Sequence, residues 1–177
     1  LSFNQKSDRQ TEDDNHLNVQ FFGSEISEMS GDKQLKEIIS FLRSRLLWLR
    51  AQPIEALIGL IGEASKKWLS DSNYAFLKDK GLLFLSNWCS TEHLTTIAKE
   101  GFRGNIHYCD GFEPFADSQK HYLKANSKGL VCHWLAGNVQ ILGFFALVQS
   151  IITKNVNLLK VSGQDDGVFV SLLKTFS

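Results

Sequence analysis

The sequence predicts an α/β protein in which a hairpin of two helices precedes the start of a parallel β-sheet. Apolar residues recur every three or four positions between Leu35 and Trp68, which is the spacing of one helix face. In the last fifty residues, two short apolar runs flank a longer apolar segment, which is typical of a βαβ unit. We therefore expect three regions: a polar tail (1–30), a helical region (31–128) and a βαβ region (129–177).

The composition narrows the classes of partner. The chain has 177 residues, 43% of them hydrophobic, and 19 basic residues balance 19 acidic ones. A surface that binds nucleic acid usually needs a basic excess, so we expect no nucleic-acid partner. The most apolar stretch, residues 139–152, is shorter than the ~20 residues of a membrane span, and we interpret it as a buried helix.

The cysteines and histidines suggest neither disulfides nor metal. Cys89, Cys109 and Cys132 form no CxxC pair, and the five histidines show no metal-ligand spacing. Free thiols are typical of a reducing compartment. We therefore predict a cytoplasmic protein without a metal site.

A polar segment precedes the helical region, and its one apolar cluster is Val19, Phe21 and Phe22. We interpret this segment as an irregular tail or as a lid that lies on a neighbouring part of the protein. The first helix is expected from Asp32 as N-cap, with an apolar face of Leu35, Ile38, Ile39, Leu42, Leu46, Leu47 and Leu49. The second helix is expected from Pro53, with a buried face of Ile54, Leu57, Ile58, Ile61, Ala64 and Trp68.

Two more short helices are expected between residues 73 and 104. Ser90 or Thr91 can cap the second of them, and Gly101 can end it. Residues 105–127 lack a clean period, and we interpret them as a loop with a short helix around 115–123.

The βαβ unit comprises a strand (129–135), a turn (136–138), a helix (139–152) and a second strand (156–161), followed by a last helix capped by Asp165 or Asp166. Strands joined through a helix are almost always parallel, so both carboxyl ends meet at one edge, where α/β sheets hold ligands. Two parallel strands do not make a complete sheet. We expect the rest of the sheet to come from further chain or from a partner.

Two residues at that edge could carry chemistry. The Asn138 amide could donate a hydrogen bond to an oxygen that becomes negative during acyl chemistry, although a turn or cap role is the commoner use of asparagine. Lys160 ends an otherwise apolar strand and needs either an anionic partner or access to water. Cys132 and His133 are adjacent in a strand, so they point to opposite faces and form no nucleophile–base pair.

No GxGxxG or GxxxxGK[ST] motif follows either strand, so a nucleotide would have to be held in another way. The segments CHWLAGNVQILG (132–143) and TKNVNLLKVS (153–162) nevertheless resemble the fatty acyl-CoA reductases of the bacterial luminescence type, in the aldehyde dehydrogenase superfamily. The resemblance implies an aldehyde-dehydrogenase-like coenzyme-binding sheet, incomplete in this chain. It also implies reduction of a fatty acyl thioester, acyl-CoA or acyl-protein, to the aldehyde through a cysteine acyl-enzyme.

The resemblance also implies roles for single residues. Asn138 would help hold the thioester oxygen, and Lys160 would contact the adenosine ribose of the coenzyme. Leu135 and Ala136 would line the nicotinamide side of the cleft, and Ser162 would belong to the same coenzyme site. An acyl-transferring partner protein and a homo-oligomeric complete form are implied as well.

Two departures from the family pattern matter. Gln140 stands where relatives carry proline, so the turn after Asn138 is less rigid. Gly163 stands where NAD-preferring relatives place a glutamate on the ribose, which favours NADPH, with NADH as the alternative.

None of the three cysteines matches the family's nucleophile motif. We therefore expect this chain to be the N-terminal part of a reductase, inactive alone. The alternative is a truncated, non-catalytic homologue that binds an acyl carrier, a nucleotide or a protein. A cysteine-dependent acyl transferase or hydrolase using Cys109 with His107 or Cys132 has weaker support.

Overall fold

The computed structural model describes residues 19–21, 24–26, 31–115, 120–135, 140–161 and 167–176. The helices in these ranges are α1 (Gly31–Ala51), α2 (Ile54–Ser70), α3 (Leu82–Trp88), α4 (Thr91–Gly101), α5 (Gln140–Ile152) and α6 (Val168–Leu173), with short 3₁₀ segments at Ser72–Lys80, Ile106–Cys109 and Lys174–Phe176. The strands are β1 (Val19–Phe21), β2 (Ser24–Ile26), β3 (Glu113–Pro114), β4 (Tyr122–Leu123), β5 (Leu130–Trp134) and β6 (Val156–Lys160).

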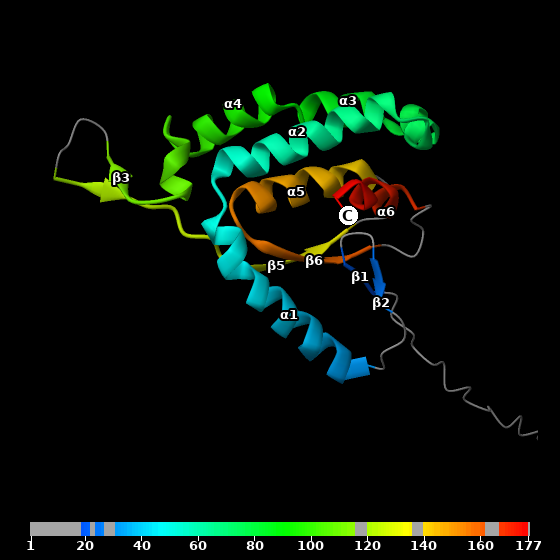
Figure 1. Ribbon diagram of the computed structural model, residues 1–177, viewed down its shortest axis with the longest axis horizontal. Coiled ribbons are helices and arrows are strands. Elements are labelled where there is room, and N and C mark those ends of the chain that lie inside the picture. The colour runs from blue at the N-terminus through cyan, green and yellow to red at the C-terminus, as the bar shows by residue number, and fades with distance from the viewer. Residues whose placement is uncertain are drawn as a thin grey trace, which may run out of the picture.

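The parallel pair β5 and β6 lies at the centre of a layered arrangement. Figure 1 shows α5 on one face of this pair and α1 on the other, with α2 beyond α5 and with α3 and α4 beyond α2. The parallel pairing and the connecting helix confirm the predicted βαβ unit. Within the described residues, no helix is both long enough and apolar enough to cross a membrane.

The main hydrophobic core lies between α2 and α5. All six residues predicted for the apolar face of α2 are buried, and Trp68 contacts the ring of Phe144 from α5 edge-on, with centroids 5.3 Å apart. A second, smaller cluster joins Ile38 and Leu42 of α1 to Val156 of β6. Each face of the sheet therefore has its own apolar contact layer.

The predicted helical hairpin is wrong in its packing. The helices α1 and α2 follow one another along the chain, but they lie on opposite sides of the layer formed by α5 and the two strands. The physical reason is that both faces of the β5–β6 pair carry apolar residues, so each face must be covered. The face away from α5 is covered by α1.

The short helices agree with their predicted signals. Ser90 caps α4, because its hydroxyl accepts a hydrogen bond from the His93 backbone N–H at 3.3 Å, and Gly101 is the last residue of α4. Helix α2 begins after Pro53, as expected. The helix α1 begins at Gly31, so Asp32 lies inside it and is not the N-cap.

Two predictions about irregular segments differ from the structure, and a third falls outside the described residues. Strands β1 and β2 pair antiparallel where an irregular tail was predicted. Strands β3 and β4 also pair antiparallel, and β4 occupies part of the range predicted as a short helix around 115–123. The proposed caps Asp165 and Asp166 lie outside the described residues, and Gly167 precedes α6.

Candidate functional site

The carboxyl ends of β5 and β6 meet at one edge of the sheet. The parallel register places Trp134 beside Lys160, and the backbone N–H of Leu135 donates a hydrogen bond to the Lys160 carbonyl at 3.0 Å. The structure therefore brings Leu135 and Lys160 together, as the βαβ prediction required. Whether they contact a coenzyme stays a prediction.

Trp134 and Lys160 form an exposed aromatic and cationic pair at this edge. The Lys160 ammonium lies 4.4 Å from the centroid of the Trp134 ring, and 80% of Trp134 is exposed to solvent. Such a cation–π contact is worth about 0.5–1 kcal/mol at an exposed site. Lys160 is exposed, so it satisfies its charge at the indole face and in water.

Side-chain alternation explains why this pair is uncovered. Leu130, Val156 and Leu158 lie on the same sheet face as Trp134 and Lys160, and these three pack in the apolar cluster under α1. The α1 cover does not extend over the last residues of the strands. Sequence reasoning missed Trp134, although a tryptophan in register with a lysine at parallel strand ends is a readable signal.

Leu135 leaves the sheet edge and turns toward the main core. It is half-buried and packs against the core cluster that includes α5. A Cβ atom at Gly143 of α5 would come within 2.8 Å of the Leu135 side chain, so a larger residue there would require Leu135 to shift. The glycine thus lets the end of β5 approach the first turns of α5.

Three predicted site residues lie outside the described residues. These are Ala136 and Asn138, between the end of β5 and the start of α5, and Ser162, just after β6. Their assignments to oxyanion and coenzyme contacts stay predictions.

The cysteines of the chain differ in their environments. Cys89 is fully buried, and this burial raises the pKa of its thiol to about 12. Burial also raises the pKa of the Cys109 thiol, which lies 3.6 Å from the Ile152 carbonyl oxygen. A thiol with a raised pKa is a poor nucleophile, which counts against a cysteine hydrolase built on Cys109.

Cys132 is exposed on β5, and the side chain of its neighbour His133 forms a hydrogen bond with another residue. One ring nitrogen of His133, Nε2, forms a hydrogen bond with Oδ1 of Asn157 on the adjacent strand at 2.9 Å. This bond gives His133 a structural role between the two strands.

The start of the two strands is held by buried polar contacts that sequence reasoning did not find. The Asn155 side-chain oxygen accepts a hydrogen bond from the Gly129 N–H at 3.0 Å, which aligns the first residues of β5 and β6. The buried ammonium of Lys154 donates to the Asp110 carboxylate at 2.5 Å and to the Arg50 carbonyl at 3.2 Å. The Ile54 N–H donates to the same Asp110 oxygen at 3.0 Å.

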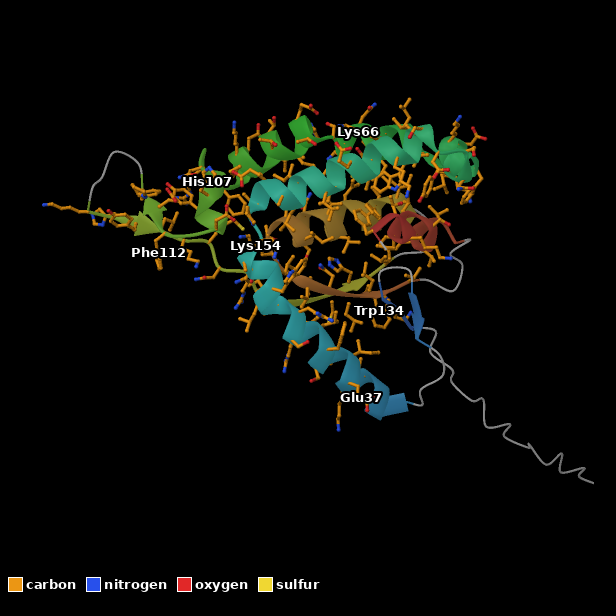
Figure 2. All side chains as sticks on the ribbon, in the orientation of Figure 1. Glu37, Lys66, His107, Phe112, Trp134 and Lys154 are labelled. Carbon is orange, nitrogen blue, oxygen red and sulfur yellow. The ribbon has the colours of Figure 1, made fainter. Side chains whose placement is uncertain are left out.

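We call this set of contacts among Lys154, Asp110, Arg50 and Ile54 the Lys154 junction. It ties the turn between α5 and β6 to the corner between α1 and α2, and Figure 2 shows Lys154 at that corner. The junction therefore lies at the amino ends of the strands, at the opposite edge from Trp134 and Lys160.

The comparisons with known proteins agree on one family. The family model described as acyl-CoA reductase (LuxC) matches residues 49–177. The long-chain acyl-protein thioester reductase of Aliivibrio fischeri is 34% identical over 96 residues, covering 51% of this chain and 19% of that protein. The reductase of the same name from Photobacterium phosphoreum is 36% identical over 73 residues, covering 41% of this chain and 14% of that protein.

The match to the long-chain acyl-protein thioester reductase of Photorhabdus luminescens is longer, with 25% identity over 151 residues, 76% of this chain and 30% of that protein. This chain thus spans less than a third of the length of these relatives. No solved structure matches the chain. Because the family model covers most of its length, including both strands of the candidate site, the chain belongs to the acyl-CoA reductase (LuxC) family.

Proposed function

We propose that this chain forms part of the coenzyme site of an NADPH-dependent reductase that converts a fatty acyl thioester to the aldehyde. Family membership and the activity for which the relatives are named support acyl thioester reduction. The observation that carries the coenzyme assignment is the exposed pair of Trp134 and Lys160 at the carboxyl ends of two parallel strands. Ligands of open α/β sheets bind at such ends.

The residues present fit a nucleotide. The indole face of Trp134 offers a stacking surface, and the Lys160 ammonium can donate to a ribose hydroxyl or a phosphate oxygen. Gly163 adds no carboxylate that would repel a 2′-phosphate, which favours NADPH over NADH. Because the chain lacks a glycine-rich phosphate loop after either strand, single placed side chains would supply most of the affinity.

In the reaction, an acyl thioester, NADPH and a proton yield an aldehyde, NADP⁺ and a free thiol. The bound coenzyme supplies the hydride. The Asn138 amide donates a hydrogen bond to the acyl oxygen as negative charge develops on it. The acyl-enzyme forms on a cysteine other than Cys89, Cys109 and Cys132, because none of the three matches the family's nucleophile motif. Burial also raises the thiol pKa of Cys89 and Cys109, which makes both poor nucleophiles.

Coenzyme titration of the purified chain tests the site. We expect NADPH to quench tryptophan fluorescence with a single dissociation constant. Lys160→Ala should raise that constant about tenfold, because one charge-assisted hydrogen bond is worth roughly 1.5–3 kcal/mol. Trp134→Leu should remove most of the quenching. Lys99→Ala, at an exposed position of α4, is the matched control and should bind as the unmodified chain does.

The acyl step is tested in the enzyme that carries this chain, with NADPH oxidation followed on a long-chain acyl-CoA. Asn138→Ala should lower kcat by ~10²-fold, as the loss of an oxyanion donor does. Lys160→Ala should raise the KM for NADPH more than it lowers kcat. Equal NADPH affinity for Lys160→Ala and Lys99→Ala would refute the coenzyme assignment, and unchanged turnover of Asn138→Ala would refute the oxyanion role.

A further inference from the structure

Glu55, His107 and Asp110 converge at the corner where α2 begins, and Figure 2 shows His107 beside the start of α2. The His107 Nδ1 atom lies 3.4 Å from Oε1 of Glu55 and 3.6 Å from Oδ2 of Asp110. One ligand atom from each of the three residues lies within 4.8 Å of the other two. Three potential metal ligands therefore face one small volume.

The distances match the edges of a metal coordination sphere better than they match direct hydrogen bonds. A tetrahedral zinc ion with ligands at about 2.0–2.2 Å separates those ligands by about 3.3–3.6 Å. A strong N–H···O hydrogen bond prefers about 2.9–3.0 Å. Both contacts of His107 thus have the separation of two atoms bound to the same ion.

The orientation of Asp110 is set by two hydrogen bonds to one of its carboxylate oxygens. Its Oδ1 atom accepts hydrogen bonds from the Ile54 N–H at 3.0 Å and from the buried Lys154 ammonium at 2.5 Å. Oδ2 is the Asp110 oxygen nearest to His107. Such outer partners of a ligating carboxylate are what hold a metal ligand in place.

The position of His107 is set separately. The Asn105 side chain accepts a hydrogen bond from the His107 backbone N–H at 3.0 Å and caps the short 3₁₀ segment Ile106–Cys109. His107 and Asp110 are therefore three residues apart on one turn, and both face Glu55 in the first turn of α2.

We propose that Glu55, His107 and Asp110 form a binding site for a zinc ion. One imidazole and two carboxylates are three protein ligands, and the half-exposed Glu55 and His107 leave a fourth position for water. An imidazole ligand argues against magnesium, which prefers oxygen ligands alone. The sequence did not predict this site, because Glu55 lies far along the chain from the other two residues. The proposal does not depend on the coenzyme site.

Spectroscopic titration tests the site. The protein is stripped of metal with a chelator and carries Cys132→Ser, because exposed Cys132 could bind metal by itself. We expect Co²⁺ to give a visible absorption band of tetrahedral cobalt that saturates at one ion per chain, without a thiolate-to-cobalt band. Zn²⁺ should abolish this band by displacement, and calorimetry should give the same stoichiometry for Zn²⁺.

Matched variants assign the ligands. Glu55→Gln combined with His107→Asn should weaken Zn²⁺ binding at least 100-fold. The control pair Glu92→Gln and His93→Asn, at exposed neighbouring positions of α4, should not change it. At a Zn²⁺ concentration of 100 times Kd, the melting temperature of the unmodified chain should rise by roughly 5–10 °C. The Glu55/His107 variant should show no such rise.

Three results would overturn the proposal: no visible cobalt band, equal Zn²⁺ affinity in the two double variants, or a melting shift that survives loss of Glu55 and His107. If the double variant does not fold, the Zn²⁺ affinity of the single variant Glu55→Gln tests the proposal. Glu55 is exposed at the start of α2, so this variant should fold and should bind Zn²⁺ at least tenfold more weakly. Unchanged affinity would then refute the site.

Discussion

Lys154 combines two features that are each unfavourable alone. Its backbone has a φ of 59°, a left-handed conformation that residues other than glycine rarely adopt. Only 3% of the residue is exposed. Burial of an unpaired ammonium would be costly, but Asp110 and the Arg50 carbonyl satisfy it. These contacts could not be predicted from the sequence, because Asp110 and Arg50 are far from Lys154 along the chain.

We predict that Lys154→Met lowers the free energy of unfolding by about 3 kcal/mol. Loss of the ammonium leaves the Asp110 carboxylate with the Ile54 N–H as its remaining hydrogen bond in the junction, and breaking a buried ion pair costs about 3–5 kcal/mol. The lower end applies because Asp110 is partly exposed. Urea unfolding followed by circular dichroism measures the change.

The matched control is Lys99→Met, which should change stability by less than about 0.5 kcal/mol because Lys99 is exposed. The double variant Lys154→Met/Asp110→Asn should be more stable than Lys154→Met, since it removes the unpaired charge. A loss below about 1 kcal/mol for Lys154→Met would show that the junction contributes little.

Among the elements, α2 depends on one close approach. A Cβ atom at Gly62 would clash with the Thr91 hydroxyl and would lie 3.2 Å from the Thr91 backbone nitrogen, so glycine lets the start of α4 pack against α2. Gly59, on the same helix, has nothing within 4 Å of its Cβ position. Substitutions at the two glycines can therefore distinguish the effect of helix propensity on stability from the effect of packing.

We expect Gly59→Ala to raise the free energy of unfolding by about 1 kcal/mol, since alanine favours a helix over glycine by that amount. Gly62→Ala should lower it by about 1–2 kcal/mol, because overpacking at Thr91 outweighs the same propensity gain. Thr91→Ala in the Gly62→Ala background should restore part of the loss. Thermal unfolding of the four proteins provides the comparison, and equal effects at the two glycines would exclude the packing explanation.

The elements that the sequence predicted are those specified by local patterns. The buried face of α2 and the order β5, α5, β6 follow from apolar spacing within a single segment. Strands β3 and β4 have two residues each, too few for any period to be visible. The hairpin prediction failed because spacing shows which face of α1 is apolar, but it does not show whether a helix or a sheet covers that face.

At the scale of the whole molecule, buried thiols link global stability to pH. Burial raises the pKa of Cys89 to about 12, and it also raises the pKa of Cys109. In the unfolded chain a thiol has a pKa of about 8.5. Above that pH the unfolded chain loses protons that the folded chain keeps. The contribution to stability is therefore complete below pH ~8.5 and is lost as pH rises toward 12.

We predict that the unmodified chain loses about 1–2 kcal/mol more stability between pH 8.5 and 10 than Cys89→Ala does, at ~1.4 kcal/mol per pH unit for one group. Comparison with this variant cancels the titration of tyrosines and lysines. The measurement is urea unfolding at both pH values. Parallel pH profiles for the two proteins would mean that Cys89 ionises without a folding penalty.

The placement of the site residues shows the same limit of sequence reasoning on a larger scale. The proximity of Leu135 and Lys160 could be predicted from the sequence, because a βαβ unit places the carboxyl ends of both strands at one edge of the sheet. The proximity of Glu55 and His107 could not be predicted, because it depends on how the start of α2 packs against the segment after α4. Contacts of that kind depend on the packing of whole layers.

The Lys154 junction has a consequence for the order of folding. Its contacts close loops of 104 residues between Lys154 and Arg50 and of 44 residues between Lys154 and Asp110. Closing such loops costs chain entropy before any contact stabilises the product, so distant contacts of this kind tend to form late. The α1–α2 corner then stays open until the βαβ unit docks. Weakening the junction should mainly speed unfolding and leave the folding rate nearly unchanged.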